Sequence, residues 1–489
     1  METQASPKLS FWRKVAFGLG DIYGGGAMVV IGFYYLVFLT DVIRINPALA
    51  GTVILISKFY DSITDPFEGI LTDRTRTRMG RRKPYLLAGI PLVFLSFFLM
   101  WYPTALASEI GRFFFVLVTY LFFSTTVSIV MLSYNAVIPE LTPDYNERTS
   151  ISSFRIFFSS IGSIIAAVVP LEIVKAFPDV HQGYIAMGIA FGLLFALPFI
   201  FTILAIRERP DFSRPLTKFN WREGFIEPFK VKTFVLALVM YLMAFVAMDV
   251  VQSVVVYYMK NYIQHPQDIT MVNGTLLIAQ LVILPVFVIL SRKTNKRTAY
   301  IAGAGLWILV MLTSLLLGPD QPRWIMYLFA AFVGFGTGGV VVIMYAIFPD
   351  IPDVGELRNG KRLEGTFSAL TTFMRKLSSA FSLFLVGNFL SLTGYLPPVQ
   401  QVVDGATRLV EQTQTPQFLL FLRLLFVLVP LVFLSLGVWA AFHFPLTLET
   451  HKRLTHLLEA RRSGTPETEE MRAEADKLSR LLVGKRRKA

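Results

Sequence analysis

Residues 84–104 read PYLLAGIPLVFLSFFLMWYPT, a run of 21 residues that contains no Asp, Glu, Lys or Arg. A helix of roughly 20 apolar residues spans the hydrocarbon core of a bilayer, because in lipid every backbone amide has to be satisfied within its own segment. Similar runs recur along the chain, which is 54% hydrophobic and only 16% charged. This composition is too apolar for a soluble domain. The sequence therefore predicts a protein whose solvent is the lipid bilayer.

The hydropathy pattern predicts twelve membrane-spanning helices, six on each side of a polar interruption. The interruption reads RERPDFSRPLTKFNWRE and runs from Arg207 to Glu223. We therefore expect an all-α membrane protein of twelve transmembrane helices in two six-helix bundles. The bundles are residues 1–206 and 229–445, joined by a cytoplasmic linker at 207–228 and followed by a cytoplasmic tail at 446–489. The expected helices lie near residues 13–41, 48–71, 84–104, 111–139, 149–171, 183–206, 229–260, 269–291, 298–318, 323–347, 364–393 and 417–443.

The net charge of +13 could indicate nucleic-acid binding, but the positions of the basic residues argue against it. With both termini placed inside, 35 of the 46 Lys and Arg residues fall in inner segments, 6 in outer loops and 5 within predicted spans. Such an excess of basic residues in inner loops fixes the orientation of a membrane protein. The first 21 residues show no apolar stretch with a small-residue cleavage site, so we expect them to lead into helix one. The expected location is the bacterial inner membrane, with both termini cytoplasmic and no contact with nucleic acid.

An enzyme is the least favoured class. The chain has no cysteine, which excludes a disulfide framework, a thiolate metal site and a cysteine nucleophile. The sequence offers no pair of nucleophile and base, no metal-ligand cluster and no extramembrane domain large enough to house a reaction site. We expect no cofactor, membrane lipid as surroundings, and a protein that is functional as a monomer.

Helix two carries charged residues where charge is costly. Lys58, Asp61 and Asp65 are spaced by three and four residues, so they share one helical face. A charge near the bilayer centre costs roughly 2.5–3.5 kcal/mol on insertion scales, which implies pairing, a water-filled cavity or a bound ion. Two carboxylates one turn apart also repel each other unless a cation or a proton lies between them. The pattern favours a cation site, and the alternative is a salt bridge from Lys58 that only locks helices together.

Other charged residues fall in predicted spans of both halves. Asp21 lies among glycines in helix one, where it is either an acceptor for a hydroxylated solute or a counter-ion for Lys or Arg. Arg155 lies in helix five. Arg375 and Lys376 are adjacent in helix eleven and point about 100° apart, so only one should face a central cavity, and we expect it to be Lys376. Asp249, Gln252 and Ser253 in helix seven could add polar contacts or form a helix-stabilising network.

Residues 61–85 read DSITDPFEGILTDRTRTRMGRRKPY, which resembles an expanded form of the major facilitator signature G-x-x-x-D-R-x-G-R-R. The motif D-x-x-x-D-P before this basic loop is similar to the glycoside, pentoside and hexuronide cation symporters, the family of the melibiose permease. Three further stretches agree with that family: GLGDIY at 18–23, SYNAVIPELTPDYNERTSISSFR at 133–155 and PDIPDVGELRNGKRLEGTFSALTTFMRKLSSAF at 349–381. The resemblance implies the major facilitator fold and cation-coupled symport of a sugar or glycoside by alternating access.

The resemblance also implies roles for individual residues. Asp61 and Asp65, with Thr64 and Ser128 as polar neighbours, are expected to take part in binding sodium, lithium or a proton, so these two aspartates would be the metal ligands of a sodium-coupled transporter. The solute-binding residues would be Asp21, Tyr134, Asn135, Arg155 and Lys376, with Lys376 close to the cation carboxylates. Residues expected to act in gating are Asp73, Arg74, Arg81 and Arg82 in the basic loop, and Asp350, Asp353 and Glu356 in the inner loop after helix ten, where the acids could pair with basic groups.

One position departs from the melibiose permease pattern. The sugar-binding aspartate of helix four is Met131 here, and the aromatic residue four positions later is Asn135. Loss of that carboxylate removes an acceptor for vicinal hydroxyls, while Arg155 and Lys376 remain. The departure argues against a galactoside and favours an anionic solute, such as a hexuronide or a sulfosugar.

Two alternatives keep the membrane fold but change the function. A lysolipid transporter would show a cavity open to lipid, lined by phenylalanines and one basic group. A non-transporting sensor or scaffold would signal through the tail, whose leucines are spaced as on one helix face and indicate either a solvated amphipathic extension or a segment that binds membrane or a partner. These leucines are Leu454, Leu457, Leu458, Leu478, Leu481 and Leu482.

Overall fold

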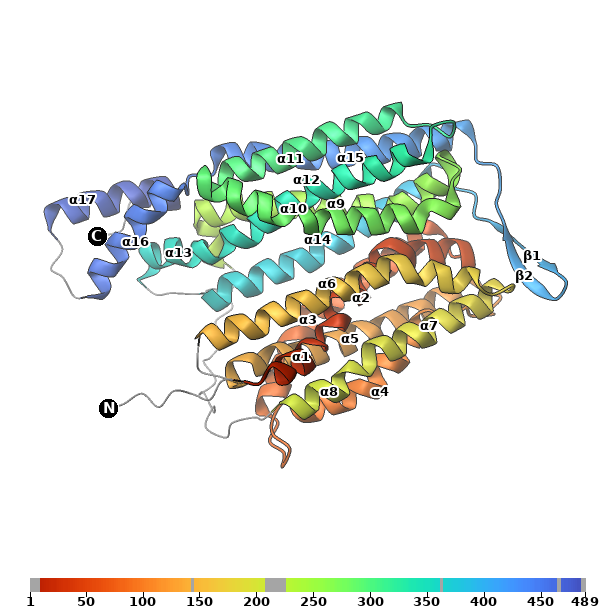
Figure 1. Ribbon diagram of the computed structural model, residues 1–489, viewed down its shortest axis with the longest axis horizontal. Helices are drawn as coiled ribbons and strands as arrows, with labels where there is room; N and C mark the ends of the chain where they lie inside the picture. Colours follow the sequence, from red (N-terminus) through yellow and green to blue (C-terminus); the bar gives the residue numbers. More distant parts are fainter. Residues whose placement is uncertain (1–8, 142–144, 207–225, 361–363, 464–467, 485–489) are drawn as a thin grey trace. The chain divides into compact units, whose positions relative to one another are not determined.

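The computed structural model describes residues 9–141, 145–206, 226–360, 364–463 and 468–484. Within these residues the chain is almost entirely helical (Figure 1). It divides into two compact units. Unit 1 contains Met1–Pro215, Gln252–Gly274 and Leu383–Leu422, and unit 2 contains Leu216–Val251, Thr275–Ser382 and Arg423–Ala489. The predicted division into bundles, linker and tail stays a prediction.

The helices of the described chain match the twelve predicted spans, and the predicted fold class is confirmed. In the first half they are α1 (Phe11–Gly18), α2 (Asp21–Val30), α3 (Pro47–Arg74), α4 (Lys83–Met100), α5 (Glu109–Leu141), α6 (Tyr145–Lys175), α7 (Val180–Ala196) and α8 (Pro198–Ala205). In the second half they are α9 (Lys232–Tyr257), α10 (Ile269–Lys293), α11 (Lys296–Thr313), α12 (Arg323–Ile347), α14 (Glu364–Leu392) and α15 (Pro416–His443). Expected helix one is formed by α1, α2 and two π-helical turns, and expected helix six by α7 and α8.

Local sequence explains where several helices begin. The side chains of Asn46, Asp179 and Asn295 each accept a hydrogen bond from a backbone N–H in the first turn of α3, α7 and α11. Such caps satisfy donors that have no partner inside the helix. Pro47 and Pro198 stand at the first positions of α3 and α8, where a missing N–H costs nothing.

Ten helical segments of the described chain are long and apolar enough to cross a membrane. The segments of α3 and α14 are not among them, and these two helices carry Lys58, Asp61 and Asp65, and Arg375 and Lys376. The ten apolar segments support an integral membrane protein, and the charged residues of α3 and α14 explain why these two helices fall outside that set.

Glycines allow the helices of unit 1 to approach closely. A Cβ at Gly162 would lie 2.6 Å from the carbonyl oxygen of Ile22, and a Cβ at Gly25 would lie 2.4 Å from that of Ser159. The backbones of α2 and α6 therefore touch without intervening side chains, as small residues permit in membrane helices. In Figure 1, α2 packs on α6 in this unit, and α4 packs on α5 and α7.

A β-hairpin interrupts the helical pattern of unit 1. Strands β1 (Val399–Val403) and β2 (Ala406–Val410) pair antiparallel and project as a narrow ribbon in Figure 1. Asp404 and Gly405 form the turn with φ of 52° and 75°. The hydropathy pattern predicts only that this region connects the helices expected at 364–393 and 417–443. The signal that could have identified it is the Asp-Gly pair, which favours a two-residue hairpin turn.

The helices that begin the two halves end in the same way. A π-helical turn at Phe38–Val42 ends helix one, and another at Tyr258–Tyr262 ends α9. Each turn is followed by an isoleucine and then by a residue in the left-handed region, Arg44 (φ 60°) or Gln264 (φ 62°). The sequences VFLTDVIRINP and VYYMKNYIQHP share little beyond this shape, so hydropathy alone did not reveal the repeat.

In unit 2 the tail folds back onto its own chain. Helix α16 (Leu448–Arg462) packs with α13 (Ile351–Asn359) and with α17 (Glu469–Leu478). A π-helical turn at Ser479–Val483, which follows α17 directly, also packs with α13. The Thr233 hydroxyl donates a 2.7 Å hydrogen bond to the carbonyl oxygen of Leu482. Five of the six predicted tail leucines are buried, whereas Leu481 is 45% exposed. Packing within the unit therefore accounts for most of the leucine pattern.

The three acids predicted to act in gating pair with basic residues of their own unit. Asp350 pairs with Lys296 at the start of α11, and Asp353 Oδ2 lies 3.2 Å from His451 Nε2. Glu356 receives two hydrogen bonds from Arg462, one of them 2.9 Å long. Two of these three partners belong to the tail, so the tail and α13 form one electrostatic unit. Their role in gating stays a prediction.

The glycine contact between α2 and α6 predicts the effect of one added methyl group. We expect Gly162→Ala to lower the free energy of unfolding by about 1–3 kcal/mol, because the backbone of Ile22 has to move away. Thermal denaturation in detergent measures the loss. The matched control is Gly305→Ala in α11, where nothing lies within 4 Å of the added Cβ. Equal melting temperatures for the two variants would contradict the close contact.

The tail contact predicts a pH dependence. The hydrogen bond to Asp353 raises the pKa of His451 above its usual 6.5, so the docked tail holds this proton more tightly than a released tail. The bond therefore supports docking fully below about pH 6.5 and is lost as pH rises through the raised pKa. A spin label on the single cysteine of Lys452→Cys should become more mobile over that rise.

His451→Gln should flatten this dependence. His456→Gln is the control, since His456 is exposed on the same helix. A label that responds to pH in the same way in both variants would show that His451 is not the titrating group.

Candidate functional site

Arg155 gathers several of the predicted solute-binding residues in unit 1. Its Nη2 lies 3.3 Å from Asp21 Oδ2 and donates a 2.7 Å hydrogen bond to Asn135 Oδ1. The three side chains come from α6, α2 and α5. Asp21 is 8% exposed, whereas Asn135 is exposed. The cluster therefore reaches from the protein interior to an accessible surface.

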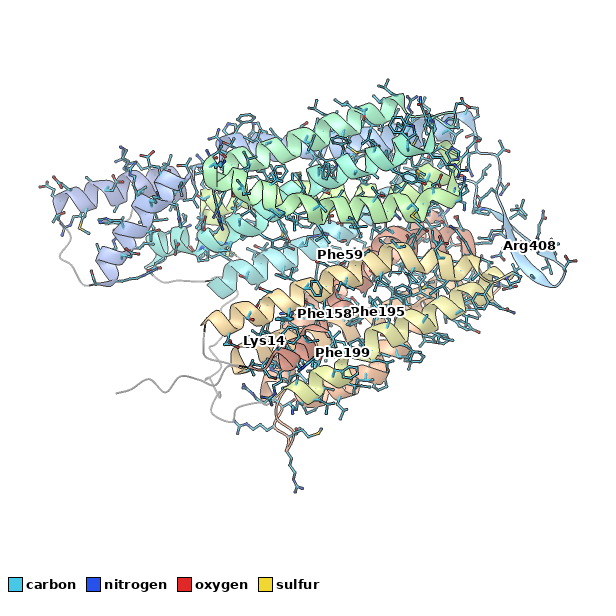
Figure 2. The ribbon with its side chains drawn as sticks, viewed as in Figure 1. Lys14, Phe59, Phe158, Phe195, Phe199 and Arg408 are labelled. Atoms are coloured by element: carbon cyan, nitrogen blue, oxygen red, sulfur yellow. The ribbon has the colours of Figure 1, made fainter. Side chains whose placement is uncertain are left out.

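The ring of Tyr134 packs against Arg155 of this cluster. The guanidinium of Arg155 lies 4.6 Å from the centre of the Tyr134 ring, a cation–π contact. The Tyr134 hydroxyl donates a 2.7 Å hydrogen bond to the carbonyl oxygen of Phe17. Phe199, labelled in Figure 2, packs edge-on against the same ring. Tyr134 thus positions the arginine with its ring, and its hydroxyl is occupied by the backbone.

The cluster still offers a hydrogen-bond donor to a ligand. Arg155 Nε is buried and has no hydrogen-bond partner among the described residues. A Cβ built at Gly24 would lie 2.5 Å from Asp21 Oδ1 and 2.6 Å from Met131 Cε. Met131, which replaces the aspartate of the melibiose permease pattern, therefore ends beside Asp21. The site combines one cationic fork, one carboxylate and an apolar thioether, which suits a solute with an anionic group and a hydroxyl.

A second polar cluster lies between α3 and α5. Lys58 Nζ lies 2.9 Å from Asp61 Oδ2, and the Ser124 hydroxyl donates a 2.6 Å hydrogen bond to Asp61 Oδ1. Lys58 is also 3.4 Å from Ser124 Oγ and faces the ring of Tyr120. Asp61 is only 1% exposed. The salt bridge that sequence analysis held as an alternative is therefore formed, and both oxygens of Asp61 have partners.

The remaining residues of the predicted cation site lie on the same two helices. Thr64 Oγ1 is buried without a hydrogen-bond partner in the described part of the chain. Ser128 is buried one turn beyond Ser124 on α5. Oxygen donors of this kind, a carboxylate and hydroxyls, fit a hard monovalent cation or a proton. Among the described residues there is no group of three His, Cys, Asp or Glu side chains that could hold a metal ion.

The contact between Ser124 and Asp61 was not predicted from the sequence. Ser124 and Ser128 share a face of α5, and the spacing of serines on one helix cannot tell which of them meets a carboxylate on another. Which serine meets Asp61 depends on the point along their axes at which α3 and α5 pack against each other. The participation of Asp65, Thr64 and Ser128 in cation binding stays a prediction.

In unit 2 the two basic residues of α14 have different surroundings. Arg375 forms a two-pronged pair with Asp249 of α9, with N–O distances of 2.7 and 2.8 Å, and lies 4.4 Å from the ring centre of Phe245. This pair ties α9 to α14, as expected for a helix-stabilising network. The predicted solute contact of the neighbouring Lys376, which lies in this unit, stays a prediction.

The basic loop after α3 is described only in part. Arg82 Nη1 donates a 2.8 Å hydrogen bond to the Thr72 hydroxyl, and Arg82 is buried. Arg81 is half-buried. The side chains of Asp73 and Arg74 lie outside the described residues. The Arg82 contact fastens the loop to the end of α3.

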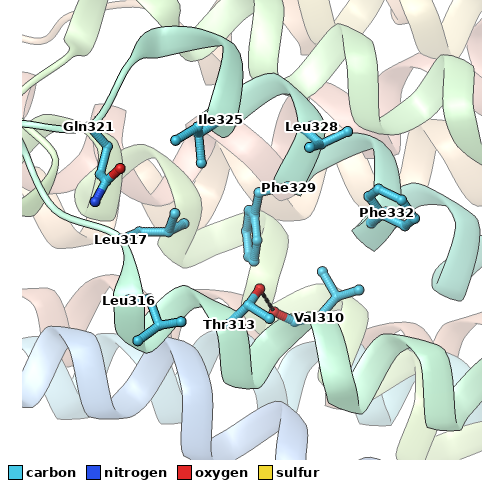
Figure 3. A pocket seen from close by; sticks show the side chains of 9 residues that line it. All are labelled: Val310, Thr313, Leu316, Leu317, Gln321, Ile325, Leu328, Phe329 and Phe332. Carbon is cyan, nitrogen blue, oxygen red and sulfur yellow. Dashed lines mark hydrogen bonds between the residues drawn. The ribbon is translucent and has the colours of Figure 1, made fainter.

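An apolar cavity of about 350 Å³ lies between the ends of α11 and α12 in unit 2 (Figure 3). Phe329 and Phe332 line it, with Thr313 and Gln321 as polar residues. No basic residue lines it, which distinguishes it from the cavity expected of a lysolipid transporter. It contains none of the predicted site residues.

Comparisons with known proteins identify the architecture and the relatives. Residues 16–448 match the family described as MFS/sugar transport protein. An uncharacterised symporter of Synechocystis sp. is 27% identical over 94% of this chain and 98% of its own length. A putative sulfoquinovose importer of Escherichia coli (strain K12) is 28% identical over 81% and 84%.

Solved structures share the fold at low identity. The crystal structure of a D-xylose-proton symporter matches with a TM-score of 0.63 and 13% identity, over 89% of this chain and 97% of that one. Family and relatives are transporters, in agreement with the expectation that the chain is not an enzyme. The resemblance to the glycoside, pentoside and hexuronide symporters is confirmed, and the chain belongs to the MFS/sugar transport protein family of the major facilitator superfamily.

Proposed function

We propose that this transporter carries an anionic sugar-like solute, such as a hexuronide or a sulfosugar, in symport with sodium or a proton by alternating access. Its proposed location is the bacterial inner membrane, with both termini cytoplasmic. The observation that carries the proposal is the cluster of Asp21, Asn135 and Arg155, which offers a cationic fork next to a hydroxyl acceptor.

The chemistry of this cluster supports an anionic solute. Guanidinium groups bind carboxylates and sulfonates through parallel hydrogen bonds, and Arg155 Nε has no partner among the described residues. Asp21 can accept a hydroxyl hydrogen bond, while Met131 supplies no second carboxylate that would repel the solute's charge. The putative sulfoquinovose importer among the relatives adds support for a sulfosugar.

The Asp61 cluster supports cation coupling through competition. The ammonium of Lys58 lies against Asp61 Oδ2 and Ser124 Oγ, the same kinds of oxygen that a sodium ion would take as ligands. Either Lys58 or the coupling cation can neutralise the charge of Asp61. Binding of the coupling cation therefore allows the Lys58 side chain to move away from Asp61. Coupling follows if the two arrangements differ in affinity for the solute, because a ligand shifts a conformational equilibrium only through differential affinity.

Removing the guanidinium should weaken the binding of an anionic solute selectively. We expect Arg155→Gln to raise the Kd of a hexuronide by about 10- to 100-fold, because charge-assisted hydrogen bonds are lost. Calorimetry with the hexuronide and with the neutral hexoside of the same skeleton measures the difference. Arg155→Lys, which keeps the charge but not the fork, should fall between. An equal change for the charged and the neutral ligand would argue against recognition of the anion.

Removing the carboxylate of Asp61 should abolish accumulation driven by a cation gradient. Asp61→Asn also removes a buried ion-pair partner of Lys58, so the decisive variant is Lys58→Gln with Asp61→Asn, which removes both charges of the pair together. Uptake into vesicles with and without a sodium or proton gradient is the measurement, and Asp320→Asn in an exposed loop is the control. Accumulation by the double variant at the parental level would refute coupling at Asp61.

A further inference from the structure

A buried acid–base cluster closes the end of unit 1 from which the hairpin projects, the end predicted to face outward. We call it the Asp41 cluster, formed by Thr40, Asp41, Tyr257, Lys260, Tyr395 and Glu411. These residues come from the end of helix one, the end of α9, and the connection between α14 and α15. The chain segments are far apart in sequence, and Asp41 and Lys260 are 219 residues apart.

The backbones around the cluster are in direct contact. A Cβ at Gly387 of α14 would lie 2.4 Å from the carbonyl oxygen of Pro47, and a Cβ at Gly51 would lie 3.0 Å from Phe384 Cα. The beginning of α3 and the end of α14 therefore close on each other without space for side chains. Opening this end of unit 1 requires these two helices to separate.

Asp41 is the centre of the cluster. It accepts hydrogen bonds from the Thr40 hydroxyl at 2.7 Å, the Tyr395 hydroxyl at 2.8 Å and Lys260 Nζ at 2.6 Å. The Tyr257 hydroxyl lies 2.8 Å from Thr40 Oγ1 and completes the network. Asp41 is 1% exposed. Three donors, one of them cationic, therefore meet at this one buried carboxyl group.

Lys260 is shared between two carboxylates. Its Nζ lies 2.6 Å from Asp41 Oδ2 and 2.7 Å from Glu411 Oε1. Glu411 follows strand β2 directly and keeps 45% of its side chain exposed. With both acids ionised the three groups carry a net negative charge next to the buried Asp41, which is costly. With a proton on Glu411 they are neutral.

The hairpin holds Glu411 in this position. Gln400 Nε2 donates a 2.8 Å hydrogen bond to the carbonyl oxygen of Val42, and the backbone N–H of Thr407 donates one of 2.6 Å to Asp179 Oδ2. The hairpin therefore bridges the end of helix one and the start of α7. The hairpin crosses this end of unit 1, and Glu411, the exposed acid of the Asp41 cluster, directly follows its second strand.

We propose that the Asp41 cluster is a proton-binding clamp, in which a proton on Glu411 stabilises the closed hairpin end and loss of that proton promotes its opening. Asp41 and Lys260 form the permanent pair, and Glu411 supplies the variable charge. The charged or titratable groups that act on Glu411 are Lys260 and Asp41, with Tyr395 also close to it, and only Lys260 among them is cationic. Burial raises the pKa of Glu411, and the charge of Asp41 acts in the same direction, partly opposed by Lys260.

The sign of the effect follows from this charge balance. A carboxyl whose pKa is higher in the closed state than in the open state binds its proton more tightly when closed. Lowering the pH therefore favours closure, and raising it through the Glu411 pKa favours opening. The π-helical turns that present Asp41 and Lys260 support a functional origin, because such turns are frequent at functional sites.

A distance measurement across this end tests the clamp. The chain has no cysteine, so spin labels at Ala107→Cys and Met271→Cys, both exposed positions of unit 1, can be attached without further changes. In nanodiscs without solute or coupling cation, electron–electron double resonance should show a longer distance gaining population as pH rises. We expect the ratio of long to short distances to change by about three- to tenfold.

Two variants decide whether Glu411 is the titrating group. Glu411→Gln keeps the shape of the protonated acid and should hold the short distance at every pH, whereas Lys260→Gln leaves two acids together and should favour the long one. Asp404→Asn removes an exposed acid at the tip of the same hairpin and should behave as the parent. A parental pH response in Glu411→Gln, or opening on acidification, would overturn the proposal. Since coupling at Asp61 is not involved, the outcome is independent of the function proposed above.

Discussion

The constraint on which this structure depends is the cost of placing charge in hydrocarbon. Four aspartates in the long helices or at their ends each meet a basic partner: Asp21 with Arg155, Asp41 with Lys260, Asp61 with Lys58 and Asp249 with Arg375. Three of these pairs join different helices, so the electrostatic requirement also decides which helices touch. Only the pair of Lys58 and Asp61 lies within one helix, and Ser124 connects it to a second.

A buried pair is a good device for a protein that changes conformation. Desolvation removes most of the net stability of such a pair, but separating the partners without replacement is costly. In the proposed function such a pair is exchanged rather than broken: a coupling cation would replace Lys58 at Asp61, and an anionic solute would share Arg155 with Asp21. Arg375 and Asp249 differ, because both prongs of the guanidinium are taken and the ring of Phe245 covers it. That geometry is suited to holding two helices together.

The sequence predicts the spans well because hydropathy is a local property, and it predicts contacts poorly because they are not local. Asp21 and Arg155 were recognised as charges in spans, and their meeting was expected from the resemblance. Ser124 was missed because two serines share a face of α5. The pair of Asp41 and Lys260 was not predicted, since nothing near either residue in the sequence indicates the other. The hairpin was not predicted, because hydropathy shows only a long polar connection there; its Asp-Gly pair is the local signal for the turn.

The paired ends of helix one and α9 show how such contacts can arise. Both helices finish in a π-helical turn, with matching backbone hydrogen bonds from Ile43 to Phe38 and from Ile263 to Tyr258, each 3.0 Å long. Counted from the start of each turn, Thr40 is equivalent to Lys260, and Asp41 to Asn261. Two helix ends with the same backbone therefore carry complementary side chains, an acid on one and a base on the other. The two helix ends share a backbone shape and an apolar character, but they differ at these two positions, and the difference allows Asp41 to pair with Lys260. Hydropathy is similar for both helix ends, so it does not reveal this pairing.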